Sequence, residues 1–162
     1  GYGLLLLLGR DGLIGGPLYD IFELDLTFTW VAAVLAAALM ALPLMVRSIE
    51  VAMAGVDHRL ELASRNLGAG PIRTFFNVTV PLSYRGILAA VFLGFARGLG
   101  EFGATVIVAG NIPGRTQTLP LGIFHNIETG DDAAAIRLIT ISLLLAVVSL
   151  LIHQRIARRR AF

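Results

Sequence analysis

Three long stretches of apolar residues alternate with polar segments along the chain. They cover residues 26–46, 86–109 and 133–152. Each is long enough to cross a bilayer, because about 20 apolar residues span a ~30 Å hydrocarbon core. The pattern predicts an all-α integral membrane protein with three membrane helices.

The ends of the first stretch carry signals of a membrane helix. Thr27 or Thr29 is a candidate N-cap, Trp30 lies where an interfacial aromatic is expected, and Pro43 predicts a kink in the last turns. The apolar segment 1–9 is too short to span alone, and we interpret it as the end of a truncated helix. Without an internal repeat or a low-complexity linker, residues 1–162 are predicted to form one transmembrane domain.

The composition agrees with a membrane protein. Hydrophobic residues make up 56% of the chain and charged residues 15%, and the mean hydropathy is +0.80. The absence of cysteine excludes a disulfide framework and a thiolate metal site. The three histidines, His58, His125 and His153, lie in different segments without the spacing of a zinc site, so we expect no metal site.

The basic residues, all of them arginine, predict the orientation in the membrane. Nine of the thirteen lie around the middle loop or at the C-terminus: Arg47, Arg59, Arg65, Arg73, Arg85, Arg155, Arg158, Arg159 and Arg160. The other connecting segments carry acids: Asp11, Asp20, Glu23, Asp25, Glu128, Asp131 and Asp132. By the positive-inside rule, the middle loop and the C-terminal tail are cytoplasmic. We interpret the arginine tail as a stop-transfer anchor or a contact with anionic lipid, and expect no nucleic-acid partner.

Residues 56–81 form a polar loop with helix start and stop signals. Asp57 is a candidate N-cap, and the apolar side chains of Leu60 and Leu67 fall on one helical face. Gly68 suits the left-handed conformation that closes a helix, and Pro71 is placed to begin a second short helix. This segment, the coupling loop, is predicted to be a helical hairpin that fits a groove on a soluble partner. The alternative is an amphipathic loop lying on the membrane surface.

The spacing within the coupling loop resembles the Glu-Ala-Ala loop of ABC importer permeases, E-A-A-x3-G-x9-I-x-L-P. Nine residues separate Gly68 from Val78, and Pro81 follows at the family position. The resemblance implies a set of ATPase-coupling residues: Glu61, Ala63, Ser64, Arg65, Gly68, Ala69 and Pro81. The family glutamate falls at Leu62, whereas Glu61 lies one residue earlier, which turns a helical side chain by about 100°.

The second apolar stretch contains two ionisable residues, Arg97 and Glu101, four positions apart on one helical face. Ionisable groups at membrane depth pair or line a polar cavity, so we expect them to pair with each other or with a neighbouring subunit. A structural ion pair and a direct contact with substrate both remain open. The surrounding glycines, Gly94, Gly98, Gly100 and Gly103, permit close helix approach or a local break in the helix.

The run FARGLGEFGATVIVAGNIPGRTQTLPLGIF, residues 95–124, is similar to the segment after the coupling loop in permeases of molybdate ABC importers, as is PLMVRSIE before it. Sulfate and tungstate permeases share parts of this run. The resemblance implies a multi-helix importer permease fold and a homodimeric inner-membrane subunit of a prokaryote. It also implies an ATP-binding subunit and a periplasmic or extracellular oxyanion-binding protein. This chain would bind no cofactor, because ATP and Mg belong to the partner ATPase.

Other classes of protein fit the residues less well. No Walker P-loop and no G-x-S-x-G motif is present, so we expect a transport subunit rather than an enzyme, with ATP hydrolysed by a partner. A membrane enzyme built on Glu101, Asp131 and Asp132 would need a nucleophile or metal, and neither His125 nor Ser142 has a visible third member. A secondary transporter or channel would use Arg97 and Glu101 as a gate or proton relay, but leaves the Gly68 hairpin without a role.

Overall fold

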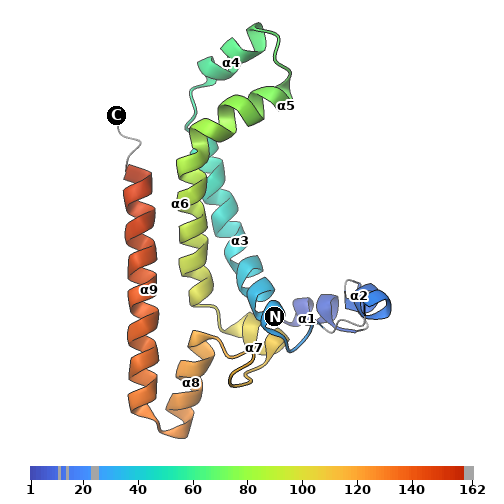
Figure 1. Cartoon of the computed structure of the whole chain (residues 1–162), viewed down its shortest axis with the longest axis vertical. Helices are drawn as coiled ribbons and strands as arrows, with labels where there is room; N and C mark the ends of the chain where they lie inside the picture. Colours follow the sequence, from blue (N-terminus) through green and yellow to red (C-terminus); the bar gives the residue numbers. More distant parts are fainter. Residues whose placement is uncertain (11, 14, 23–25, 159–162) are drawn as a thin grey trace. The chain divides into compact units, whose positions relative to one another are not determined.

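The computed structural model describes residues 1–10, 12–13, 15–22 and 26–158, and the regular structure of these residues is entirely helical. The helices shown in Figure 1 are α1 (Tyr2–Leu8), α2 (Gly15–Phe22), α3 (Trp30–Ala54), α4 (His58–Asn66), α5 (Pro71–Thr74), the π-helix η1 (Phe75–Thr79), α6 (Val80–Leu99), α7 (Gly103–Ala109), α8 (Leu119–Thr129) and α9 (Asp132–Arg158). The prediction of an all-α fold is confirmed. Five charged residues of the sequence analysis lie outside the described residues: Asp11, Glu23, Asp25, Arg159 and Arg160.

Three helical segments are long and apolar enough to cross a membrane: Trp30–Ala54, Pro71–Leu99 and Asp132–Ala157. Only 22%, 33% and 11% of their most apolar windows are buried, which leaves broad apolar surfaces for lipid or another subunit. The first begins later than the expected range 26–46 and ends later, at Ala54, whereas the third extends beyond the expected range 133–152 at both ends. Thr29 caps the first, because its hydroxyl oxygen accepts from Ala32 N at 3.2 Å.

The second span differs from the expected range 86–109 at both ends. It begins earlier, because α5 continues through η1 into α6 without a separate second helix. It also ends earlier, at Leu99, and α7 is a separate helix. The break follows from local bonds: Glu101 N donates to Gly98 O at 3.0 Å, and the Glu101 carboxylate accepts from Ala104 N at 3.0 Å. The side chain thus satisfies a backbone donor at the start of a new helix.

The contacts group the chain into two compact units, which we describe separately. The first comprises residues 1–41 and 95–147. Its apolar core consists of Leu8, Ala32, Ala33, Val108 and Ala109, with Leu4, Leu5 and Leu26 packed against it. Hydropathy alone did not predict helix α8. It has a proline in its first turn and is closed by Gly130 in the left-handed conformation.

The second unit comprises residues 42–94 and 148–162, of which the structure describes those up to 158. Helices approach closely at Gly94, where an added Cβ would overlap the thioether of Met45. Polar bonds join α6 to α9: Ser149 Oγ donates to Phe92 O at 2.8 Å, and His153 Nδ1 lies 2.8 Å from Ala89 O. Small residues and interhelical hydrogen bonds are the usual means of packing helices in lipid.

Candidate functional site

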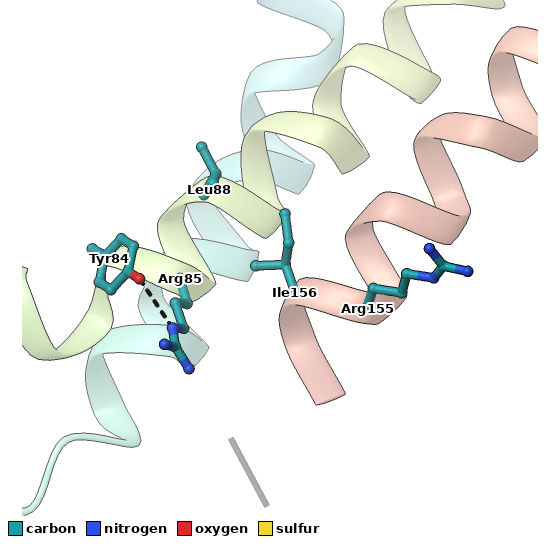
Figure 2. Close-up of a pocket in the computed structure, with 5 residues that line it drawn as sticks. All are labelled: Tyr84, Arg85, Leu88, Arg155 and Ile156. Atoms are coloured by element: carbon teal, nitrogen blue, oxygen red, sulfur yellow. Dashed lines mark hydrogen bonds between the residues drawn. The ribbon is translucent and has the colours of Figure 1, made fainter. Parts of the chain in front are cut away.

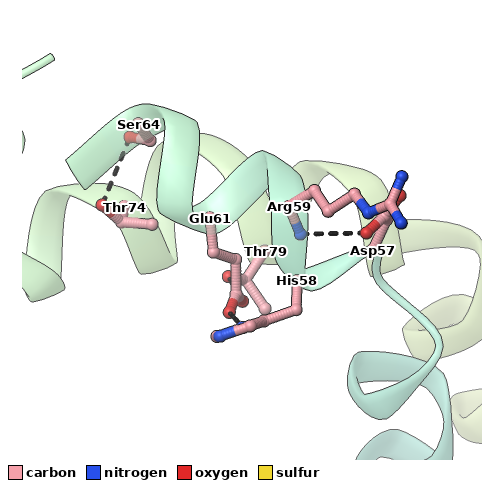
Figure 3. Close-up of polar contacts among 7 residues, drawn as sticks. All are labelled: Asp57, His58, Arg59, Glu61, Ser64, Thr74 and Thr79. Atoms are coloured by element: carbon pink, nitrogen blue, oxygen red, sulfur yellow. Dashed lines mark hydrogen bonds and ion pairs between the residues drawn. The ribbon is translucent and has the colours of Figure 1, made fainter. Parts of the chain in front are cut away.

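The coupling loop begins with a capped helix. Asp57 Oδ1 accepts from Arg59 N at 2.9 Å, so the predicted N-cap of α4 is confirmed (Figure 3). Helix α4 has no buried residue, and it presents Leu60 and Leu62 with roughly half of each side chain exposed. Its stability therefore depends on caps and on a few polar contacts rather than on a core of its own.

The hairpin turn has the predicted glycine chemistry. Gly68 has φ +88°, and three successive N–H groups close the end of α4: Leu67 to Ala63 O, Gly68 to Arg65 O and Ala69 to Ser64 O, at 3.1, 2.9 and 3.2 Å. Pro71 then occupies the first turn of α5. The loop is therefore two helical arms joined by a tight left-handed turn.

Two side-chain contacts connect the arms (Figure 3). Thr79 Oγ1 donates to Glu61 Oε1 at 2.6 Å, and the hydroxyls of Ser64 and Thr74 lie 3.2 Å apart. His58 Nδ1 lies 3.1 Å from the other oxygen of Glu61. The Thr79 hydroxyl, and after it His58, lowers the pKa of the Glu61 carboxyl below its usual value. Sequence reasoning did not select Thr74 or Thr79, because the contacts depend on how two helices lie side by side.

The turn end of the coupling loop is apolar and exposed. Leu67 is 90% and Ile72 75% exposed, and no atom lies within 4 Å of a Cβ added at Gly68. Of the other residues selected for coupling, Ala63, Arg65 and Pro81 are exposed and Ala69 is half-buried. Glu61 and Ser64 instead face the second arm. The structure thus separates the predicted set into an outward group and an inward pair.

In the other unit, the charged residues of the second apolar stretch lie together. Arg97 Nη1 donates to Glu101 Oε2 at 3.0 Å, with 45% of the arginine side chain and 9% of the glutamate side chain exposed. The second carboxylate oxygen of Glu101 accepts from Ala104 N. Glu101 therefore has two partners, one of them at the start of α7.

The segment after α7 forms a compact loop. Ile112 O accepts from the N–H groups of Arg115, Thr116 and Gln117, and Gln117 Nε2 donates to Asn111 Oδ1 at 3.0 Å. Gly110 and Gly114 adopt positive φ values of +71° and +74°, which favour glycine. The IPGRTQTLP run is thus a folded loop rather than a simple connection.

A small cavity of about 230 Å³ lies between α6 and α9 in the second unit, lined by Tyr84, Arg85, Leu88, Arg155 and Ile156. Arg85 Nε donates to its neighbour, Tyr84 Oη, at 3.0 Å. The guanidinium of Arg155 points away from Arg85, so the two charges do not converge on one ligand position (Figure 2). Among the described residues, no group of three or more His, Cys, Asp or Glu side chains could hold a metal ion.

Comparisons with known proteins add to this geometry. The family model described as "Binding-protein-dependent transport system inner membrane component" matches residues 4–162. The chain is 52% identical over 165 residues to the "Molybdenum transport system permease protein ModB" of Escherichia coli K12, covering 99% of this chain and 72% of the relative.

Two further relatives bear on the cargo. The protein of the same name from Haemophilus influenzae is 45% identical, over 98% of this chain and 70% of its own length. The "Sulfate transport system permease protein CysW" of Synechococcus elongatus is 35% identical, over 98% of this chain and 57% of its own length.

Proposed function

Because this chain belongs to the family of inner-membrane components of binding-protein-dependent transport systems, we propose that it is the membrane-spanning subunit of an ATP-driven importer for molybdate. Members of this family are transport components, and an ATP-binding subunit and a binding protein are implied as their partners. The family favours an importer over an ion-gradient-driven transporter or a channel.

One observation carries the choice of cargo. Identity to a molybdenum permease is 52% over nearly the whole chain, whereas identity to a sulfate permease is 35%. Tungstate is the first alternative, because it is an oxyanion of the same charge and shape. Sulfate is the second, supported by the more distant relative.

The coupling loop is the part of the chain that we assign to the ATP-binding subunit. Its apolar turn, with Leu67 and Ile72 exposed, suits a groove on a soluble partner. The arginines around it support a cytoplasmic position for this loop and for the C-terminus. ATP and Mg are bound and used by that partner, and this chain contributes no cofactor site.

The complete importer in this proposal contains two copies of this chain, with the broad apolar faces of the three long helices available for the second copy and for lipid. A periplasmic or extracellular protein delivers the oxyanion. Arg97 and Glu101 form the charge pair of the pathway segment, and the half-exposed guanidinium supplies positive charge for an oxyanion.

The test is ATP hydrolysis by the complete complex in liposomes, with molybdate, tungstate, sulfate or phosphate added in turn to the binding protein. We expect stimulation by molybdate, with or without tungstate. Stimulation by sulfate alone would select the sulfate importer. If none of the four anions stimulates an intact complex, molybdate, tungstate, sulfate and phosphate are excluded as the cargo.

A further inference from the structure

The second arm of the coupling loop, α5, continues into the membrane span through a π-helical turn. The segment η1 lies between α5 and α6, and the N–H of Val80 donates to Phe75 O, a bond that spans five residues. π-Helical turns are rare and frequently occur at functional sites. This one connects the coupling loop to the membrane span, so its side chains are placed to affect how the two are joined.

The π turn allows both threonines to face α4. Thr74 and Thr79 are five positions apart, and an α-helix would rotate the second by about 140° from the first. The wider π turn reduces this rotation, because its hydrogen bonds join residues five apart. Both side chains are buried, Thr74 to 1% and Thr79 to 7% exposure, although Phe75, Phe76 and Asn77 between them are exposed.

The bond made by Thr79 is unusual for a helical threonine in this chain. Thr105, Thr129 and Thr140 donate to carbonyl groups only three or four residues earlier in the chain. Thr79 instead donates to a carboxylate in another helix, 18 positions away. At 2.6 Å the contact has the length of a charge-assisted hydrogen bond, about 2.5–2.7 Å.

Neighbouring groups hold both ends of this bond. Ser83 Oγ, fully buried, donates to the carbonyl oxygen of Thr79 at 2.7 Å. His58 lies against the second oxygen of Glu61. The Ser64–Thr74 contact adds a second point of attachment one helical turn along α4. The four residues Glu61, Ser64, Thr74 and Thr79 are hereafter the brace.

We propose that the brace, set in register by the π turn, fixes α4 to the start of the membrane span, so that Thr79 and Glu61 are positioning residues for coupling rather than contacts with the ATP-binding subunit. This inference rests on the proposed function, in which the coupling loop binds that subunit through its apolar turn. The inward direction of Glu61 carries it, because the carboxylate is occupied by partners within its own chain.

The experiment uses the complete complex in lipid vesicles with three variants of this chain. Thr79→Val removes the hydroxyl and keeps the shape, Thr79→Ser keeps the hydroxyl, and Thr140→Val is the matched control on α9. Amide hydrogen exchange over residues 58–66 reports the attachment of α4. Molybdate moved per ATP hydrolysed reports coupling.

We expect Thr79→Val to speed exchange in α4 by about fivefold, the size of one lost hydrogen bond, and to lower the molybdate moved per ATP. Thr79→Ser and Thr140→Val should match the native chain in both readouts. Glu61→Gln replaces the carboxylate that accepts this bond on α4. It should raise the exchange rate of α4 by less than Thr79→Val does, because the amide oxygen can still accept from Thr79.

Native exchange in α4 of both Thr79→Val and Glu61→Gln would overturn the brace. Faster exchange in Thr79→Val with native molybdate transport per ATP would overturn the coupling role, because loosening α4 would then have no effect on transport. The exchange readout needs no cargo. If the native complex moves no oxyanion, the proposed function fails, while exchange still decides whether the brace exists.

Discussion

The Arg97–Glu101 pair gives a prediction that can be worked out from its geometry. Arg97→Ala removes the ion pair and leaves the Glu101 carboxylate, 9% exposed, with Ala104 N as its remaining partner, so we expect a loss of about 1 kcal/mol. Glu101→Ala removes the same pair and also the acceptor for Ala104 N, a helix-start bond of about 1 kcal/mol. We therefore expect a loss of about 2 kcal/mol for this second variant.

The double variant should lose no more than Glu101→Ala alone, because Arg97 has no pair left to lose. The two single losses sum to about 3 kcal/mol, so the expected coupling is about 1 kcal/mol. Glu101→Gln should fall between Arg97→Ala and Glu101→Ala, because its amide oxygen still accepts from Ala104 N.

Thermal unfolding of the detergent-solubilised protein, followed by circular dichroism, measures these losses. At this chain length 1 kcal/mol corresponds to a shift in Tm of about 2–4 °C. Arg137→Ala is the matched control, because that exposed guanidinium donates to Ala133 O of its own helix, and its loss should stay within about 0.5 kcal/mol. Additive losses in the double variant would refute the reasoning, since they would mean that the two side chains do not share a bond.

Three further predictions concern the second unit. Gly68→Ala should destabilise the hairpin by about 1–2 kcal/mol, because φ is +88° at this position although no neighbouring atom would clash with a Cβ. Gly68→Asn should cost less, because asparagine tolerates the left-handed conformation. Hydrogen exchange at the turn ranks the two variants, and equal exchange rates would contradict the turn geometry. The lowered pKa of Glu61 means that its contribution to the order of α4 is present above pH 4.5 and is lost as the pH falls further; Glu61→Gln should remove this acid transition in exchange, and its persistence would assign it to another group. Gly94→Ala should lower the melting temperature because its Cβ meets Met45, and Met45→Ala should restore part of the loss; a neutral Gly94→Ala would exclude close approach there.

Local chemistry explains what could be predicted from the sequence. The Asp57 cap, the left-handed Gly68 and the first-turn position of Pro71 depend on neighbouring residues only, and the structure has all three. Runs of apolar residues indicate membrane helices, so the existence of the three spans could be predicted from the sequence, but their ends could not. The first membrane helix, α3, continues past Arg47, whose guanidinium pairs with the Glu50 carboxylate on the same helix at 3.3 Å.

Features that depend on a particular backbone bond were not accessible. The glycines around residue 100 allowed a local break, and the structure has one between Leu99 and Gly103. Hydropathy alone reads residues 86–109 as one span, because an averaged window does not register that Glu101 can satisfy Ala104 N and begin a new helix. The π turn is likewise invisible to a pattern with a 3.6-residue period. Thr79 and Glu61 are 18 positions apart, and only the packing of two helices brings them together.

The continuity of Pro71–Leu99 has a mechanical consequence. At 1.5 Å per residue, its 29 residues are about 43 Å long, and α5, the second arm of the coupling loop, forms one end. A tilt of about 5° about one end displaces the other by roughly 4 Å, less than the ~5.4 Å rise of one helical turn. If a partner docks on the coupling loop as proposed, a small rotation of that partner would displace the far end of this helix without breaking a bond within it.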